Sequence, residues 1–291
     1  MYAAPFEYYA PTSLAEALGL LVRHGDDAKL IAGSQSLVPL MKLRLAQPRH
    51  VVDLRKVPGL SGIREEGGEL QIGAFTTHHA VASSELVRSK LPMMAEAGAH
   101  IGDAQVRNLG TIGGSLAHAD PSADWPAVLV AHDASARIAS SRGERTVKVE
   151  QLIVGPLTTV LQPDEILVQV RVPLPSGRHG EAYEKLPHPA SRFAVVGVAA
   201  ALVLDGKGAV QSSRVALTGL APKVTRAAHV EQALQGKAPD AGALKAAAAR
   251  AAEGIDLRAD LIGSAAYRAH LAAVYAERAL RRAAGRAAER R

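Results

Sequence analysis

The chain contains no cysteine and few aromatic residues. Among its 291 residues, aromatics make up 3% and cysteine is absent. Without cysteine, this chain can hold neither a disulfide framework nor a zinc or iron–sulfur site bound by its own thiolates. The scarcity of aromatics argues against a stacking platform for single-stranded nucleic acid. No apolar run reaches the roughly 18 residues of a membrane span, and MYAAPFEYYAP at the start lacks the features of a secretory signal. We therefore expect a cytoplasmic protein with no integral membrane span.

The positive charge of the chain is concentrated at its C-terminal end. The net charge is +6, and six arginines and one glutamate lie between Arg278 and Arg291. The remainder is close to neutral, so we do not expect a nucleic-acid partner. We interpret the arginine-rich segment as a solvated helix end and tail, since arginine suits the C-terminal end of a helix. Binding of this segment to a partner chain is the alternative.

Short helices and strands alternate in the first part of the sequence. Ser13 and Glu16 have the spacing of a capping box, which predicts a helix to about His24. Short apolar runs predict buried strands at 28–33 and 50–54, and both belong to a small α/β unit. Further strands are predicted at 68–74, 134–141, 145–152 and 165–173, in an antiparallel or mixed sheet, with helices near 76–89, 91–101 and 124–131.

The segment PLPSGRHG, residues 173–180, is the best candidate for a domain boundary. Beyond it we expect a strand, a turn at 205–208 and a second strand, followed by helices at 225–235, 240–253 and 264–283. These signals predict an α+β chain with a first domain at 1–177, in two parts near 1–55 and 56–177, and a second domain at 178–291.

Several common catalytic and nucleotide-binding motifs are absent. The sequence has no G-x-G-x-x-G fingerprint of a dinucleotide-binding Rossmann fold, no phosphate loop ending in G-K-[ST] and no G-x-S-x-G nucleophile elbow. The pairs His78–His79 and His118–Asp120 lack the spacing of established metal sites. We interpret these histidines as surface or supporting residues, and we predict neither a metal ligand nor a catalytic residue on this chain.

Two glycine-containing loops carry the main chemical signal. The first is Ala32–Ser36, AGSQS, and the second is Thr111–Ser115, TIGGS. Each offers consecutive backbone N–H groups without bulky side chains, together with hydroxyls, which is the chemistry of a nest for a diphosphate. Either loop alone is typical of a structural turn. Together, each beside a predicted strand, they indicate a two-sided clamp.

The order of these segments resembles the FAD-binding medium subunit of molybdenum hydroxylases, the group that contains carbon monoxide dehydrogenase and xanthine dehydrogenase. The matching stretches are AGSQSLVPLMKLRLAQPRHVVDL (32–54), LQIGAFTTHHAV (70–81), QVRNLGTIGGSLAHADPSADWPAVLVA (105–131), LQPDEILVQVRVP (161–173), AYEKLPHPASRFAVV (182–196) and YRAHLAAV (267–274). The resemblance implies an FAD-binding domain of the PCMH or vanillyl-alcohol-oxidase type, with a small α/β subdomain and a subdomain built on a mixed or antiparallel sheet. A C-terminal α+β domain with a short antiparallel sheet and helices would follow.

The resemblance also implies which residues bind FAD. In that family the two loops clasp the FAD diphosphate from opposite sides. Asp124 matches an acidic residue that holds the adenosine part, and Lys185 matches a lysine near the flavin, where a cation would stabilise negative charge. Ile101 and Leu167 match apolar wall positions. The full set implied is Ala32, Gly33, Ser34, Gln35, Ser36, Leu37, Ile101, Thr111, Ile112, Gly113, Gly114, Ser115, Asp124, Leu167 and Lys185.

The first loop departs from the family pattern at one position. The family usually has Ala-Gly-Gly there, whereas this chain has Ser34 as the third residue. If that position requires a positive φ, serine costs about 1 kcal/mol of backbone strain, which a contact of its hydroxyl would offset.

The resemblance implies a division of labour among three chains. A large subunit would carry the molybdenum cofactor and a small subunit two [2Fe–2S] clusters, which fits the absence of cysteine here. Electrons would pass from the clusters through FAD on this chain to an external acceptor, in a dimer of heterotrimers. Two alternatives are a self-sufficient FAD-dependent oxidoreductase with its own substrate site and an interaction module without a cofactor.

Overall fold

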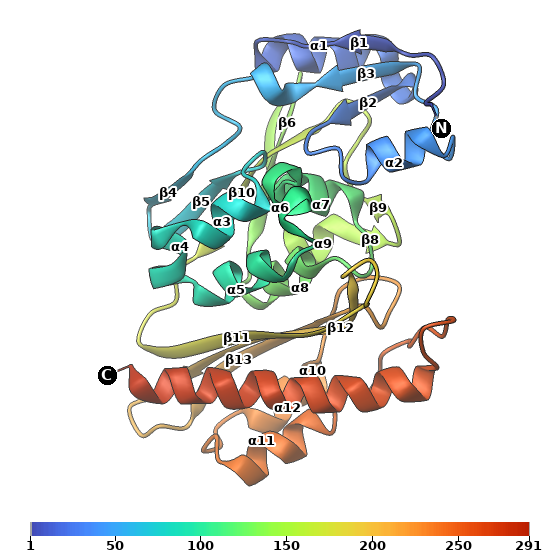
Figure 1. Ribbon diagram of the computed structural model, residues 1–291. Helices are drawn as coiled ribbons and strands as arrows, with labels where there is room; N and C mark the ends of the chain where they lie inside the picture. The colour runs from blue at the N-terminus through green and yellow to red at the C-terminus, as the bar shows by residue number, and fades with distance from the viewer. Residues whose placement is uncertain (1, 291) are drawn as a thin grey trace.

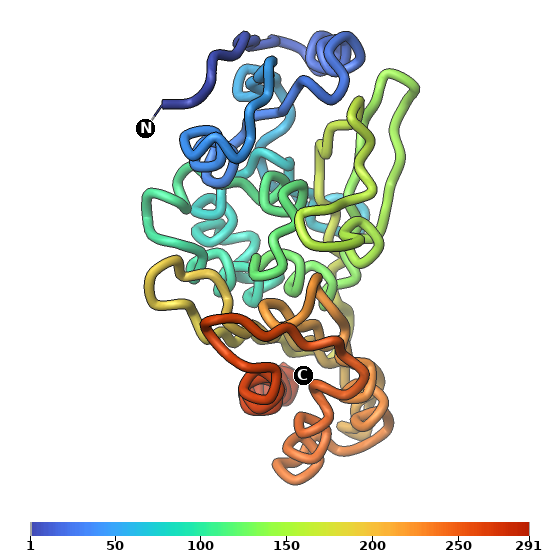
Figure 2. The backbone as a smooth tube through the Cα atoms, turned by 90° about the vertical axis from the view of Figure 1, so that its right-hand side faces the viewer, coloured from blue at the N-terminus to red at the C-terminus, as the bar shows by residue number. Residues whose placement is uncertain are grey.

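Three principal sheets follow one another along the chain in the computed structural model, which describes residues 2–290 (Figure 1). The N-terminal sheet lies at one end, a larger sheet with its helices in the middle, and a C-terminal sheet with a long helix at the other end. Figure 2 shows the same order from a second direction. The described chain thus alternates sheets and helices, and it matches the expected α+β class.

The N-terminal sheet is parallel. Its strands are β1 (Glu7–Tyr9), β2 (Ala28–Ile31) and β3 (His50–Asp53), in the order β1-β3-β2. Helix α1 (Leu14–His24) starts as the capping box predicts, because the Ser13 side chain accepts a hydrogen bond from the Glu16 amide. Parallel strands need a crossover connection, and between β2 and β3 it contains only the short helix α2 (Leu37–Lys42). A six-residue helix leaves almost no periodic signal in the sequence.

The middle sheet is antiparallel, with β10 at its centre. Its order is β4-β5-β10-β6-β7, and β10 is buried on both faces. Val168 faces the core of the N-terminal sheet, while Val170 lies in the core that the helices cover. Gln169 is also buried and donates a hydrogen bond to Gln71 at 3.1 Å. Burial of both faces does not follow from the alternation of apolar and polar residues at 165–173, which is typical of a half-exposed strand.

Short helices pack around this sheet, and four of the five residues expected to form the second glycine loop, Ile112–Ser115, are instead the first turn of one of these helices, with Thr111 as its N-cap. The strands are β4 (Ile63–Glu66), β5 (Glu69–Gly73), β6 (Ser135–Ser140), β7 (Gly143–Lys148) and β10 (Ile166–Pro173), with a small hairpin of β8 (Ile153–Gly155) and β9 (Thr158–Thr159). The helices are α3 (His78–Ser83), α4 (Glu85–Lys90), α5 (Pro92–His100), α6 (Ala104–Leu109), α7 (Ile112–His118), α8 (Asp124–Ala131) and α9 (Val149–Leu152).

The C-terminal sheet lies between α8 of the middle layer and the long helix α12 (Ala265–Glu289) (Figure 1). Gly180 allows the close approach of α12, since a Cβ there would collide with the Ala283 carbonyl oxygen. The strands are β11 (Arg178–Pro187), β12 (Ala194–Leu204), β13 (Val210–Thr218) and β14 (Thr225–Arg226), accompanied by α10 (Ala228–Leu234) and α11 (Ala241–Ala248). Within residues 2–290, no helix has both the length and the apolar character needed to cross a bilayer.

The arginine-rich end of the chain is part of helix α12, so the expected tail is wrong for residues 278–289, while Arg278 and Arg281 are exposed, as a solvated helix end predicts. Ala279, Leu280 and Ala283 are buried against the C-terminal core. Arg282 bonds to Glu96 of α5 at 2.9 Å, and Arg286 bonds to the same carboxylate. These two arginines therefore join α12 to the middle layer. Arg291 lies outside the described residues.

Arg268 provides a test of how α12 is held. This fully buried guanidinium donates to the carbonyls of Val195 at 2.7 Å and Gly219 at 2.5 Å, and to both oxygens of Asp260 at 2.8 Å. Arg268→Met leaves these acceptors without their donor and should lower the free energy of unfolding by about 3–5 kcal/mol. Urea denaturation measures it. The control Arg278→Met changes an exposed residue of the same helix and should cost less than about 1 kcal/mol.

Candidate functional site

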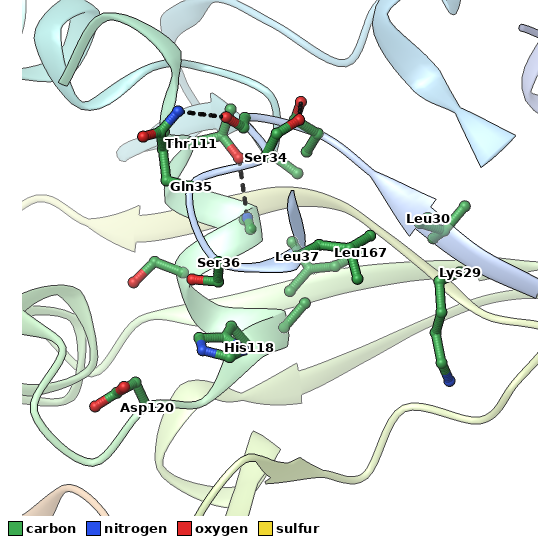
Figure 3. A pocket seen from close by; sticks show the side chains of 18 of the residues that line it. Lys29, Leu30, Ser34, Gln35, Ser36, Leu37, Thr111, His118, Asp120 and Leu167 are labelled. Atoms are coloured by element: carbon green, nitrogen blue, oxygen red, sulfur yellow. Dashed lines mark hydrogen bonds between the residues drawn. The ribbon is translucent and has the colours of Figure 1, made fainter. Parts of the chain in front are cut away.

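A cavity of about 560 Å³ lies between the N-terminal and middle layers. Both glycine loops line it, together with residues of β10 and of the connection between β11 and β12. In Figure 3, Ser34, Ser36 and Leu37 of the first loop lie around the same space as Thr111 and Leu167. Its volume falls within the range of about 300–1,000 Å³ that is common for small-molecule and cofactor sites.

The first loop turns sharply where β2 ends and leaves its amides free. Ser34 has a φ of 64°, so it adopts the left-handed conformation that favours glycine. Its hydroxyl contacts the Ala32 carbonyl at 3.4 Å, which is a long hydrogen bond that returns little of the strain. No backbone carbonyl among residues 2–290 accepts from the amides of Gly33, Ser34, Gln35, Ser36 or Leu37. These five consecutive N–H groups are the donors that a nest for an anion would use.

The second loop differs from that expectation, because Ile112–Ser115 are the first turn of α7 and their amides are already bonded within the chain. The Ile112 amide donates to Thr76 and the Gly113 amide to Ala74, at 3.1 and 2.8 Å. Thr111 accepts hydrogen bonds from the next two amides. Its hydroxyl accepts from the Gly114 amide at 3.1 Å, and its carbonyl accepts from the Ser115 amide at 3.0 Å. The prediction of a second backbone nest is therefore wrong. What this loop offers to the cavity is the hydroxyl of Ser115 and a surface without bulky side chains.

The two loops touch each other through their glycines. A Cβ on Gly33 would collide with the Leu109 carbonyl oxygen and lie 2.6 Å from the Gly110 Cα. A Cβ on Gly114 would lie 3.9 Å from that of Ala32, which is ordinary contact. Only glycine at position 33 allows the first loop to approach the start of the second this closely.

Most of the other residues implied by the resemblance line the same cavity. Ile101 and Leu167 contribute apolar wall, and Asp124 lies at its edge. Ile112 does not line it, since its side chain is fully buried in the core of the middle layer. Lys185 does not line it either and reaches the cavity only through its contact with Asp124.

Asp124, which lines the cavity, forms a buried ion pair with Lys185. The Lys185 Nζ lies 2.9 Å from Asp124 Oδ2, and the two side chains are 2% and 4% exposed. The Tyr183 hydroxyl donates to Asp124 Oδ1 at 2.5 Å. Burial raises the pKa of Asp124, and Lys185 and Tyr183 oppose that rise by stabilising the carboxylate. Both carboxylate oxygens thus have a donor within the chain.

The C-terminal sheet holds the segment that leads into Asp124. The Gly219 amide donates to the Pro121 carbonyl at 2.8 Å, and the Ala194 amide donates to that of Ser122 at 3.1 Å. These bonds join strands β12 and β13 to the segment between α7 and α8. The position of Asp124 therefore depends on both parts of the chain.

The connection between β11 and β12 was not predicted to be part of the site. Ser191, Arg192 and Phe193 of this connection line the cavity. His188 closes the turn, because its amide donates to the Phe193 carbonyl at 2.8 Å and its carbonyl accepts from the Arg192 amide at 2.9 Å. The sequence contains Pro189 in a short segment between two apolar strands. This proline indicates a turn but does not show which part of the chain the turn contacts.

His78 was also underestimated, since it supports the second loop from within the core. Its Nδ1 accepts a hydrogen bond from Trp125 Nε1 at 2.9 Å, and a Cβ on Gly110 would lie 2.6 Å from its Nε2. The side chain is buried, and burial lowers the pKa of His78 to about 4. Among residues 2–290, no group of three or more histidine, aspartate or glutamate side chains is arranged to bind a metal.

The pKa of His78 predicts a pH dependence of stability. Since the pKa in the folded state lies below the unfolded value of about 6.5, the stabilisation is full above pH 6.5 and is lost as the pH falls toward 4. The loss from this group is about 3 kcal/mol. His78→Gln keeps an acceptor for Trp125 and should remove this part of the slope in urea denaturation. The exposed neighbour is the control: if His79→Gln changes the slope equally, the assignment to His78 fails.

Two family models match successive parts of the chain. Residues 4–175 match the family model described as FAD binding domain in molybdopterin dehydrogenase, and residues 181–283 match that of the CO dehydrogenase flavoprotein C-terminal domain. The carbon monoxide dehydrogenase medium chain of Hydrogenophaga pseudoflava is 42% identical over 97% of this chain and 98% of its own length.

Two solved structures share the fold. A carbon monoxide dehydrogenase structure from Hydrogenophaga pseudoflava has a TM-score of 0.94 and 43% identity, covering 98% of this chain and 99% of that one. Quinoline 2-oxidoreductase from Pseudomonas putida 86 has a TM-score of 0.93 and 36% identity, covering 99% of each. The two matched domains, the loops around the cavity and these relatives together place the chain in the family of FAD-binding medium subunits of molybdenum hydroxylases.

Proposed function

We propose that the cavity binds FAD, with its diphosphate at the five free amides of the first loop, and that this chain is the electron-transfer subunit of a three-chain molybdenum hydroxylase. The observation that carries the proposal is the run of N–H groups from Gly33 to Leu37 that have no backbone acceptor within residues 2–290, in a loop that lines the same cavity as Ser115. Backbone amides in this arrangement suit anionic oxygens, and a diphosphate is the anionic part of FAD.

The residues present fit the cofactor. The nest and the hydroxyl provide donors for a diphosphate, while Ile101 and Leu167 provide apolar surface for the ring systems on either side. When bound, FAD supplies the capacity to accept and release electrons. The residues of this chain hold it, orient it and set the charge around it.

We propose that Asp124 and Lys185 both lie at the flavin end. The resemblance assigns Asp124 to the adenosine and Lys185 to the flavin, but the two side chains are in contact at 2.9 Å. In an extended FAD the two ring systems lie on opposite sides of the diphosphate, so one ion pair serves a single end. The Tyr183 hydroxyl and the Lys185 ammonium occupy the two oxygens of Asp124. Because both oxygens of Asp124 already accept a hydrogen bond, this carboxylate is better suited to influencing the charge around the cofactor than to binding ribose hydroxyls.

The expected partners follow from the same proposal. A large subunit carries the molybdenum cofactor and the hydroxylation chemistry, and a small subunit carries two [2Fe–2S] clusters that deliver electrons to this FAD. The absence of cysteine here supports placing those clusters on another chain. We further propose a division of this chain at 177/178, a dimer of heterotrimers, and a cytoplasmic location; limited proteolysis, light scattering and cell fractionation test these three points.

Gly33→Ala tests the cavity directly. The added Cβ collides with the backbone at Leu109 and Gly110, so the first loop must shift and FAD affinity should fall by at least about tenfold. Flavin absorbance and fluorescence titration of the purified chain measure it. Gly19→Ala in α1 is the matched control, because nothing lies within 4 Å of its Cβ. Equal FAD affinity in Gly33→Ala and wild type would contradict the assigned site.

Ser34 gives the complementary test, because its backbone already adopts a positive φ. Ser34→Gly should retain FAD with unchanged stoichiometry, since glycine accepts this conformation without strain. Ser34→Leu places a bulky side chain in the cavity wall and should release the cofactor. A leucine variant that keeps its flavin would show that this loop does not face the diphosphate.

Co-purification tests the subunit role. Affinity isolation of the chain from its native cells should recover two further polypeptides, one with molybdenum and one with iron. The isolated chain, loaded with FAD, should not turn over an organic substrate. Sustained single-chain turnover would instead support a self-sufficient oxidoreductase.

A further inference from the structure

Tyr183 joins the C-terminal sheet to the cavity through one short hydrogen bond. It lies on β11, is 1% exposed, and donates from its hydroxyl to Asp124 Oδ1 at 2.5 Å. Lys185 lies two residues further along the same strand and bonds to the other oxygen of Asp124. One strand therefore provides both groups that occupy this carboxylate.

The position of the Tyr183 hydroxyl depends on a glycine in the neighbouring strand. A Cβ on Gly197 of β12 would collide with the hydroxyl oxygen of Tyr183 and would lie 2.8 Å from Thr218 Cγ2 and 3.1 Å from the Tyr183 Cζ. Any larger residue at 197 would displace the phenol ring. Gly197 thus leaves the space that lets Tyr183 reach Asp124.

The bond also decides how the ion pair is oriented. Asp124 is 4% exposed, so its charged form needs donors within the protein. With Oδ1 bonded to Tyr183, Oδ2 faces the ammonium of Lys185, which also donates to the His100 carbonyl at 3.2 Å. Without the hydroxyl, one oxygen of a buried carboxylate loses its donor and the carboxylate can rotate.

We propose that Tyr183 is a positioning residue that orients the Asp124 carboxylate and so holds the Lys185 ammonium beside the flavin end of the cavity. This inference rests on the proposed FAD site and deepens it. Tyr183 acts through Asp124 rather than on the cofactor. A residue of the C-terminal sheet, Tyr183, then influences the charge of the Asp124–Lys185 pair near the flavin.

The ionisable groups around Asp124 determine the expected pH effect. Among the described residues, those that act on its carboxyl are Lys185 and Tyr183 of β11 and His100 at the end of α5. All three favour the carboxylate, while burial opposes it. Removing the Tyr183 hydroxyl removes one of these contributions, so Asp124 should take up its proton at higher pH.

Tyr183→Phe in the full chain without FAD tests the positioning step. The readout is the infrared carbonyl band of protonated Asp124 as a function of pH, assigned by its loss in Asp124→Asn. The midpoint should rise by about one to two pH units in Tyr183→Phe. The control is Tyr275→Phe, which changes another buried tyrosine and should leave the midpoint unchanged. Within residues 2–290, the Tyr275 ring contacts Arg278, and its hydroxyl is not bonded to Asp124. An unchanged midpoint in Tyr183→Phe would overturn the proposal.

Gly197→Ala, on β12, should disrupt the same hydrogen bond between Tyr183 and Asp124. It should raise the midpoint in the same direction as Tyr183→Phe, and the double variant should show no more than the larger single effect, because both changes remove one hydrogen bond. Additive shifts would contradict the role assigned to Gly197.

The link to the flavin is measured separately on the FAD-loaded chain. The midpoint potential of the flavin as a function of pH should show an inflection at the pKa of Asp124, displaced upward in Tyr183→Phe by the same amount. If the Asp124 midpoint moves but the flavin potential does not follow it, Tyr183 positions the pair as proposed and the assignment of the pair to the flavin end fails. If neither moves, the positioning role itself fails.

Discussion

The cavity depends on the close approach of Gly33 to the backbone at Leu109 and Gly110, where a single added carbon would not fit. That contact holds the first loop against the segment that precedes the second, and both loops line the cavity. The second loop is held rigidly by bonds from its own amides to Ala74 and Thr76. In the proposed site, the first loop binds the anion and the second is the support against which the first is placed. The two glycine motifs, similar in sequence, have different physical roles.

The C-terminal sheet completes the site rather than forming a separate module. It holds the segment before Asp124 through Ala194 and Gly219, and it supplies Lys185 and Tyr183 to the carboxylate. The arginines of α12 fasten the same sheet to the middle layer. A change in the C-terminal part can thus alter the charge at the cavity without touching it. This coupling gives a physical reason for the two matched domains to occur together in one chain.

Local signals in the sequence predicted the elements better than their partners. The capping box at Ser13 and the loop at Ser34 follow from residue type and spacing, and the structure has both. The amides of the second loop could not be assigned, because their acceptors lie in another part of the chain. The same holds for the pair of Asp124 and Lys185, 61 residues apart, and for Arg282 with Glu96, 186 residues apart. Periodicity contains no information about such distant partners. The arginines that bond to Glu96 were therefore predicted to be solvated.

The most direct test of the account is an experimental structure of the chain with FAD bound. The account predicts that diphosphate oxygens accept hydrogen bonds from amides between Gly33 and Leu37, and that the isoalloxazine ring lies at the end of the cavity bounded by Asp124. A diphosphate placed elsewhere, with those amides still unbonded, would contradict the assigned nest. An isoalloxazine ring at the opposite end, near Lys29, would contradict the assignment of the buried ion pair to the flavin.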